Sequence, residues 1–202
     1  MIYIVGLTGG IGSGKSAASA WFEQQDIVVV DADIVAREVV EVGQPALFEI
    51  QKKFGDWVLD ENGSLNRSAL REHIFKHPEA RQQLEEITHP VIRQSIITQL
   101  HQASSAYAIL VSPLLFETDQ HLLCQRNLLI DVPAEIQLER ASQRDGQSLE
   151  QIERIIQAQM SRSEKQKRAD DVVDNSDTLD SLYQQLQPLH QRYLQFAQAT
   201  QQ

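Results

Sequence analysis

The chain has 202 residues, a length that suits one domain or one core that carries insertions. Its net charge of −10 argues against broad binding to nucleic-acid backbones, which requires a basic surface. The single cysteine, Cys124, excludes an intramolecular disulfide, and a reducing compartment is the simplest interpretation. No apolar run reaches the ~18 to 20 residues that cross a bilayer, and the N-terminus lacks the features of a signal peptide. We expect a cytoplasmic protein with no nucleic-acid or membrane partner, either a monomer or a weak homo-oligomer.

Five short apolar runs predict the strands of the fold. They are residues 2–7, 27–30, 108–111, 128–132 and 172–173. The first, third and fourth runs lack strict alternation, a pattern that is typical of parallel strands buried on both faces. Predicted helices separate the five runs, so the fold class is α/β with a parallel sheet.

The long connection between the second and third runs predicts a mainly helical insertion. Asn66 is placed to cap a helix over residues 67–75. Pro78 and Pro90 each stand where the first position of a helix is expected. Residues 60–63, Asp-Glu-Asn-Gly, predict a turn.

A second excursion, from Pro133 to Asp171, is charged and carries only a thin apolar stripe. Between residues 140 and 168 seven basic residues outnumber four acidic ones, a local charge of +3 in an acidic protein. This pattern favours a mobile flap over a core element. After the fifth run, leucines at helical spacing predict a closing helix that packs on the sheet.

Residues 9–16 read Gly-Gly-Ile-Gly-Ser-Gly-Lys-Ser and match the pattern G-x-x-x-x-G-K-[ST] in full. Glycines let such a loop bend sharply, so that consecutive backbone N–H groups face phosphate oxygens. The following helix adds the partial positive charge of its N-terminus. Lys15 is expected to reach the β- and γ-phosphates, and the Ser16 hydroxyl to ligate Mg²⁺. The loop predicts a nucleoside triphosphate site but does not identify a reaction.

The second run ends in Asp31-Ala32-Asp33, at the edge of the sheet where ligands bind in open parallel folds. A carboxylate there can accept the proton of a substrate hydroxyl during phosphoryl transfer. The pair can divide this work, one carboxylate taking the proton and the other holding a metal-bound water. From position alone, a simple helix-capping role for the two aspartates remains open.

Two other functions fit the loop. A kinase for another small hydroxyl substrate, such as a nucleoside, would have a similar core and a different insertion. A GTPase or nucleotide switch needs a D-x-x-G motif, and residues 60–63 provide one. That motif lies inside the insertion, however, and no N-K-x-D guanine-reading motif occurs in the chain.

Taken together, these motifs resemble the dephospho-coenzyme A kinase family. The resemblance rests on the loop with Thr8 before it, on Asp31-Ala-Asp33 with Arg37, and on His89-Pro90 with Arg93. It extends to Pro113-Leu-Leu-Phe-Glu117, to the Arg140 and Arg144 pair, and to the stretch at residues 169–175. The matching motifs appear in order along nearly the whole chain. One departure is Asn175-Ser176-Asp177, where the family has Asn-x-Gly.

The resemblance implies ATP-dependent phosphorylation of the ribose 3′-hydroxyl of dephospho-coenzyme A, with Mg²⁺ as cofactor. Asp33 would be the base, Lys15 and Arg140 would assist the transfer, and Ser16 would hold the metal. The implied ATP contacts are Gly10, Ile11, Gly12, Ser13, Gly14, Lys15, Ser16, Ala17, Arg144 and Asn175, the last of them near adenine. The implied contacts to dephospho-coenzyme A are Asp31, Asp33, Arg37, His89 and Arg93.

The expected architecture is a P-loop NTPase-type, three-layer core with a five-stranded parallel sheet. The core comprises residues 1–33, 105–134 and 170–202. Residues 34–104 form the helical insertion for the coenzyme A substrate, and residues 135–169 form a helical lid.

Overall fold

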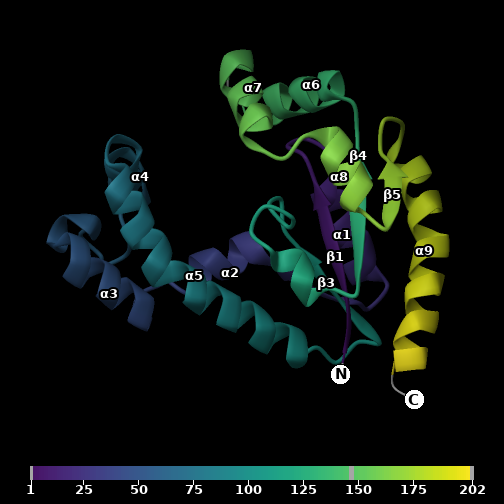
Figure 1. Cartoon of the computed structure of the whole chain (residues 1–202), viewed down its shortest axis with the longest axis horizontal. Coiled ribbons are helices and arrows are strands. Elements are labelled where there is room, and N and C mark those ends of the chain that lie inside the picture. The colour runs from purple at the N-terminus through teal and green to yellow at the C-terminus, as the bar shows by residue number, and fades with distance from the viewer. Residues whose placement is uncertain (1, 146–147, 201–202) are drawn as a thin grey trace. The chain divides into compact units, whose positions relative to one another are not determined.

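The computed structural model describes residues 2–145 and 148–200, with the side chains of residues 144 and 145 excluded. The described residues divide into two compact units. The first comprises residues 1–31 and 100–202, and the second comprises residues 32–99. Figure 1 shows the elements of both units.

The described part of the first unit contains a five-stranded parallel sheet in the order β2-β3-β1-β4-β5 (Figure 1). Its strands are β1 (Tyr3–Gly9), β2 (Val28–Asp31), β3 (Tyr107–Val111), β4 (Arg126–Asp131) and β5 (Asp171–Asp174). The register pairs Leu7 of β1 with Val111 of β3 and with Leu128 of β4. All five predicted strands are therefore confirmed, and the fold is α/β. Burial explains why apolar runs predicted them, since β1 and β3 are buried along their whole length.

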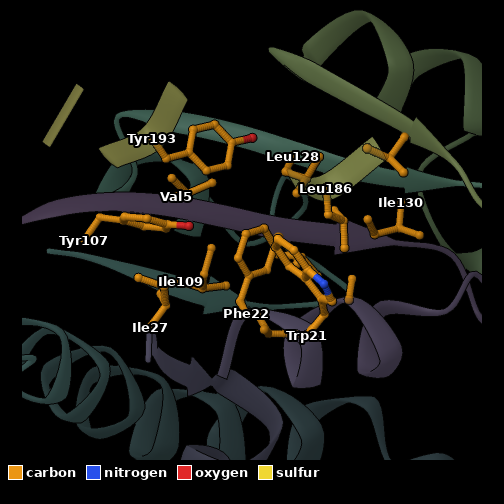
Figure 2. Close-up of a cluster of buried hydrophobic side chains, with 14 of the residues drawn as sticks. Val5, Trp21, Phe22, Ile27, Tyr107, Ile109, Leu128, Ile130, Leu186 and Tyr193 are labelled. Carbon is orange, nitrogen blue, oxygen red and sulfur yellow. The ribbon is translucent and has the colours of Figure 1, made fainter. Parts of the chain in front are cut away.

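Helices α1 (Lys15–Gln24) and α9 (Leu179–Thr200) cover one face of this sheet. Side chains of β1 and β3 on that face, including Val5 and Ile109, pack against Trp21 and Phe22 of α1 and against α9 (Figure 2). The rings of Trp21 and Phe22 meet edge to face at 5.1 Å. The predicted closing helix is thus confirmed, and both aromatic residues belong to the core.

On the other face of β1, Gly6 lies between Ile4 and Thr8 and lets neighbouring side chains approach the strand closely. A Cβ atom at Gly6 would approach Leu115, Cys124 and Asn127 to between 2.7 and 3.0 Å. The short helix η2 (Gln120–Leu123) packs on β1, and α8 (Arg162–Arg168) packs on β4. Before α8 come α6 (Ala134–Asp145) and α7 (Leu149–Ala158), which pack on each other.

The second unit is helical in its described part. It contains α2 (Ala32–Glu38), α3 (Pro45–Phe54), η1 (Asp56–Val58), α4 (Arg67–Lys76) and α5 (Pro78–His101) up to residue 99. Helices α3 and α4 both pack on η1. The Asn66 side chain accepts a bond from the N–H of Ala69, so the predicted cap of α4 is confirmed.

The prediction of a new helix at Pro90 is wrong, because α5 continues through this residue. Proline lacks the N–H that would bond the carbonyl of Glu86, four residues earlier. Both Pro90 and Glu86 are exposed, so water can satisfy that carbonyl. Pro78 does begin α5, as predicted, and residues 60–63 form the predicted turn with a bond from Gly63 N–H to the Asp60 carbonyl.

Candidate nucleotide-binding site

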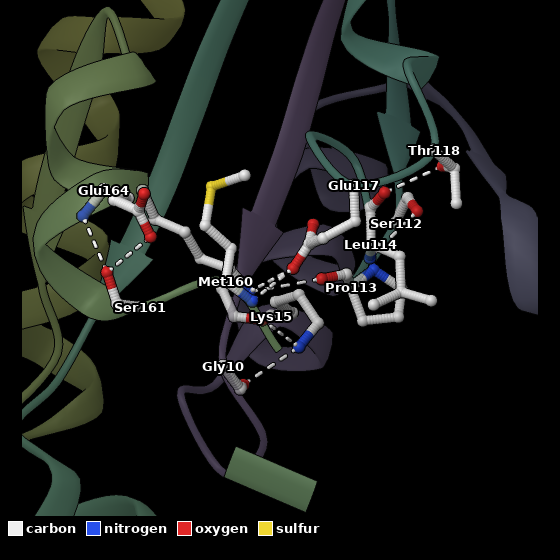
Figure 3. Close-up of polar contacts among 12 residues, drawn as sticks. Gly10, Lys15, Ser112, Pro113, Leu114, Glu117, Thr118, Met160, Ser161 and Glu164 are labelled. Atoms are coloured by element: carbon white, nitrogen blue, oxygen red, sulfur yellow. Dashed lines mark hydrogen bonds and ion pairs between the residues drawn. The ribbon is translucent and has the colours of Figure 1, made fainter. Parts of the chain in front are cut away.

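The glycine-rich loop connects the buried strand β1 to α1. Gly12 and Gly14 both adopt positive φ angles, 69° and 94°, which side-chain-bearing residues rarely adopt. Lys15 Nζ donates to the carbonyls of Gly9 and Gly10 at 2.9 and 3.0 Å (Figure 3). Residues 12–16 line a hollow of about 200 Å³ together with Arg140. The loop therefore surrounds a concave site at the N-terminus of α1, the geometry that binds anions.

Close packing against α6 is a second reason for the glycines of this loop. A Cβ atom at Gly12 would lie 2.8 Å from the backbone carbonyl oxygen of Gln137 in α6. A Cβ atom at Gly10 would lie 2.4 Å from Gln137 Oε1, the end of a side chain that is itself buried. Gln137 Nε2 in turn donates to the carbonyl of Val132, which follows β4. The first turns of α6 thus rest directly on the loop.

Asn175, just after β5, connects the loop to Arg140. Its Nδ2 donates to the carbonyl of Ser13 at 2.8 Å, and its own carbonyl accepts a bond from Arg140 Nη1 at 2.8 Å. Its backbone N–H donates to the carbonyl of Asp131 at the end of β4. Strands β4 and β5, helix α6 and the loop are therefore joined at one buried residue.

Helix α8 is fastened to the sheet by Asp131. This carboxylate, buried at the end of β4, accepts bonds from Arg162 Nε and Nη2 and from Gln166 Nε2, the closest at 2.8 Å. A forked pair of this kind is stronger than a single contact. The hydrogen bond to Asp131 is also the main cause that raises the pKa of Arg162.

A second attachment joins α8 to the segment after β3 (Figure 3). Lys165 is buried, with Nζ 3.5 Å from Glu117 Oε1 and 3.4 Å from the carbonyl of Pro113. Glu117 Oε1 also accepts a bond from the N–H of Met160 at 2.8 Å. Burial lowers the pKa of Lys165, and the nearby Glu117 carboxylate partly opposes that shift. Within the predicted lid, α8 is thus held to the core by several polar contacts.

The structure brings some of the predicted site residues together. Residues 12–16 and Arg140 line the hollow, and Asn175 bonds to Ser13 and to Arg140. Asp31 ends β2 and pairs in register with Val111 of β3, and Val111 pairs with Leu7 of β1. With strands about 4.8 Å apart, Asp31 is level with Leu7, two residues before the loop begins at Gly9, at a spacing of about 10 Å.

The remaining predicted residues belong to the second unit or fall outside the described side chains. Asp33 and Arg37 lie on α2, and His89 and Arg93 lie four residues apart on α5, all of them exposed. Arg144 is part of α6, but its side chain lies outside the described residues.

Sequence reasoning missed the anchoring residues Asp131, Gln137 and Glu117. A signal existed for Asp131, because it ends an apolar strand as Asp31 does. Glu117 lies within a motif that carried the family resemblance, yet nothing local predicts its contact with Met160, 43 residues away.

Among residues 2–145 and 148–200, no cluster of three or more His, Cys, Asp or Glu side chains could hold a metal ion. No helix in this described part of the chain is long and apolar enough to span a membrane.

Comparison with known proteins agrees with this geometry. The profile of a family described as dephospho-CoA kinase matches residues 3–181. A dephospho-CoA kinase of Acinetobacter baylyi is 70% identical over 193 residues, covering 96% of this chain and 99% of that protein.

Two solved structures match the fold over 95% of this chain and 97% of their own. They are TT1252 from Thermus thermophilus, at 31% identity and a TM-score of 0.81, and a dephospho-CoA kinase from Campylobacter jejuni, at 28% and 0.72. The loop, the sheet and these similarities lead to one assignment: the chain belongs to the dephospho-CoA kinase family.

Proposed function

We propose that this protein transfers the γ-phosphoryl group of ATP to the ribose 3′-hydroxyl of dephospho-coenzyme A. The products are coenzyme A and ADP, and the reaction is the last step of coenzyme A synthesis. The observation that carries this proposal is the 70% identity to a dephospho-CoA kinase across 96% of the chain. The loop hollow lined by Lys15 and Arg140 supports it, because phosphoryl transfer depends on positioning and on neutralising phosphate charge.

In the proposed mechanism, the loop amides and Lys15 hold the phosphates of ATP. Arg140 lines the same hollow and would neutralise charge that develops during transfer. Arg144 would assist it from the same helix, and Ile11 and Ala17 would border the bound nucleotide. Residues 135–169 would act as the lid.

Asp33 is proposed to accept the proton of the 3′-hydroxyl as the new oxygen–phosphorus bond forms and ADP leaves. Asp33 is an exposed residue that follows the end of β2 by two positions. Asp31, Arg37, His89 and Arg93 would bind dephospho-coenzyme A. Residues 34–104 would form the part of the chain that receives this acceptor.

The described residues fit a magnesium ion that arrives with ATP. Mg²⁺ prefers to keep several waters and to take few protein ligands besides phosphate oxygens. Ser16 is exposed beside Lys15 in the hollow and would provide a hydroxyl ligand. The ion would supply charge neutralisation at the phosphates.

The proposal is tested by incubating the protein with Mg-ATP and one acceptor at a time. The panel is dephospho-coenzyme A, adenosine, uridine and pantothenate, with ADP formation as the readout. We expect rapid ADP formation only with dephospho-coenzyme A, and ³¹P NMR should place the new phosphate on the 3′-oxygen. ADP formation without an acceptor, or only with a nucleoside, would contradict the proposal.

A further inference from the structure

Asn175 occupies an unusual position for a residue expected to contact adenine. Its side chain is buried, at 4% exposure, and its Nδ2 is engaged with the carbonyl of Ser13 at 2.8 Å. The partner lies inside the phosphate-binding loop, 162 residues earlier in the chain. The amide of Asn175 is therefore directed at the loop backbone.

The fit between this amide and the loop is tight. A Cβ atom at Gly14 would lie only 2.1 Å from Asn175 Nδ2, so the amide fills the space that a side chain at Gly14 would need. Gly14 also has a φ of 94°, which glycine adopts without strain. Two independent features, backbone conformation and close approach, thus make Gly14 and Asn175 a matched pair.

Holding the Ser13 carbonyl also fixes the N–H of Gly14. In a planar trans peptide the C=O of one residue and the N–H of the next point in opposite directions. The Ser13 carbonyl points to Asn175, so the Gly14 N–H points away from it. Gly14 lines the hollow, where such amides would meet phosphate oxygens.

The backbone of Asn175 is also hydrogen-bonded, and its carbonyl holds the Arg140 guanidinium, a charged group of the hollow. Its N–H donates to the carbonyl of Asp131 at 2.9 Å, which continues the pairing of β5 with β4. Its carbonyl accepts from Arg140 Nη1 at 2.8 Å. One residue therefore sets the direction of a loop peptide and the position of a guanidinium.

We propose that Asn175 is a positioning residue for the triphosphate, acting through the Ser13–Gly14 peptide and Arg140, with no contact to the base. This inference rests on the proposed function only in taking the loop as the ATP site. It replaces the adenine contact that family resemblance implies for this position.

The test measures nucleotide binding without any acceptor. A fluorescent ADP analogue is displaced by ATP or by inorganic tripolyphosphate, which has no base, from the wild type and from Asn175→Ala and Asn175→Asp. Both substitutions remove the donor to Ser13 and leave a buried carbonyl unpaired, so we expect each ligand to bind about 10-fold more weakly. The loss should be equal for ATP and tripolyphosphate.

Asn127→Ala is the matched control, since Asn127 lies at the start of β4 with Nδ2 3.5 Å from Asp170. It should leave both affinities unchanged. In turnover, Asn175→Asp should raise the KM for ATP and leave the KM for the acceptor unaltered. Weaker binding of ATP but not of tripolyphosphate would indicate a base contact and overturn the proposal.

An Asn175 variant with a lower Tm but unchanged affinities for ATP and tripolyphosphate would also overturn the proposal. Asn175 would then have only a structural role. A measurement on the wild type remains decisive if both variants fail to fold. The side-chain amide protons of Asn175 should exchange slowly with solvent in NMR spectra of the free protein, and rapid exchange would contradict the proposal. Failure to phosphorylate dephospho-coenzyme A would leave these binding results untouched.

Discussion

Asp33 is the residue on which the proposed chemistry most depends. It is an exposed residue of α2, two positions after the end of β2. We expect Asp33→Asn to lower kcat by about 10²-fold or more, because the amide cannot accept the proton of the hydroxyl. Binding of ATP should change little. Steady-state kinetics and nucleotide titration measure the two effects.

The control for this substitution is Asp26→Asn, an exposed turn residue with a φ of 58°, which asparagine tolerates. It should retain full activity. If Asp33→Asn also remains near the wild-type rate, Asp33 is not the base, and Asp31→Asn becomes the decisive variant.

Asp171 illustrates a carboxylate with a structural role. It is buried at the start of β5 and accepts bonds from Arg126 Nη2 at 3.0 Å and from the Tyr193 hydroxyl at 2.9 Å. Burial opposes its ionisation, but the bonds from Arg126 and Tyr193 outweigh it, and the pKa of Asp171 is lowered. A lowered pKa means that the folded state favours the charged form.

Asp171→Asn should therefore lower the free energy of unfolding by about 3 to 5 kcal/mol at neutral pH, because Arg126 loses its charged partner. The wild type should lose this contribution as the pH falls below about 4, through the lowered pKa of the folded state. Urea denaturation at pH 7 and pH 3 measures both values. A difference between variant and wild type that is the same at both pH values would contradict this account.

At the scale of elements, the loop and α6 form one packed unit. A side chain at Gly12 would suffer both a positive φ and a 2.8 Å approach to the Gln137 carbonyl. Gly63 has a similar φ of 75° with no atom within 4 Å. Substitution of Gly63 therefore tests backbone strain alone, and substitution of Gly12 tests backbone strain together with steric contact.

Gly63→Ala should cost about 1 to 2 kcal/mol of stability, the strain of the left-handed conformation alone, and leave activity intact. Gly12→Ala should lose more stability and should also weaken ATP binding at least about 10-fold, because α6 must move off the loop. Thermal unfolding and nucleotide titration of both variants check this. Equal effects of the two substitutions would show that the contact with α6 is unimportant.

Sequence reasoning predicts these elements unevenly, for physical reasons. Strands β1 and β3 are visible because they are buried along their whole length, and that burial demands uninterrupted apolar runs. The cap at Asn66 and the phosphate loop are local patterns, and local patterns survive without tertiary information. Asp131 with Arg162 and Lys165 with Glu117 join residues far apart in the chain. No periodicity in the sequence encodes such pairs. The residue type at Pro90 likewise does not indicate that water can satisfy the Glu86 carbonyl, which lacks its helical hydrogen bond.

At the scale of the whole molecule, the two compact units have separable roles in the proposed reaction. Arg37 and Arg93 are exposed residues of the second unit. The double substitution of both to Ala should raise the KM for dephospho-coenzyme A about 10-fold or more, since two cations that would meet an anionic substrate are lost. The KM for ATP should stay within about twofold.

Arg81→Ala is the matched control, because Arg81 is an exposed arginine of α5 that pairs with Glu85 at 2.8 Å. The KM values for ATP and for dephospho-coenzyme A should be unchanged in Arg81→Ala. Product formation at varied concentrations of each substrate measures both KM values. An equal rise in the two KM values of the double variant would contradict a division of labour between the units.

The two tryptophans of the chain give each unit its own spectroscopic reporter. Trp21 is 6% exposed and lies in the helix that follows the loop, packed edge-on against His190 at 5.9 Å. Trp57 is 42% exposed in the second unit, with its ring 4.8 Å from that of His73. Each Trp→Phe variant would leave one fluorescent tryptophan. The emission maximum should be blue-shifted where Trp21 remains and red-shifted where Trp57 remains. Titrating ATP and the acceptor against these variants would then show which ligand changes the fluorescence of each unit's tryptophan.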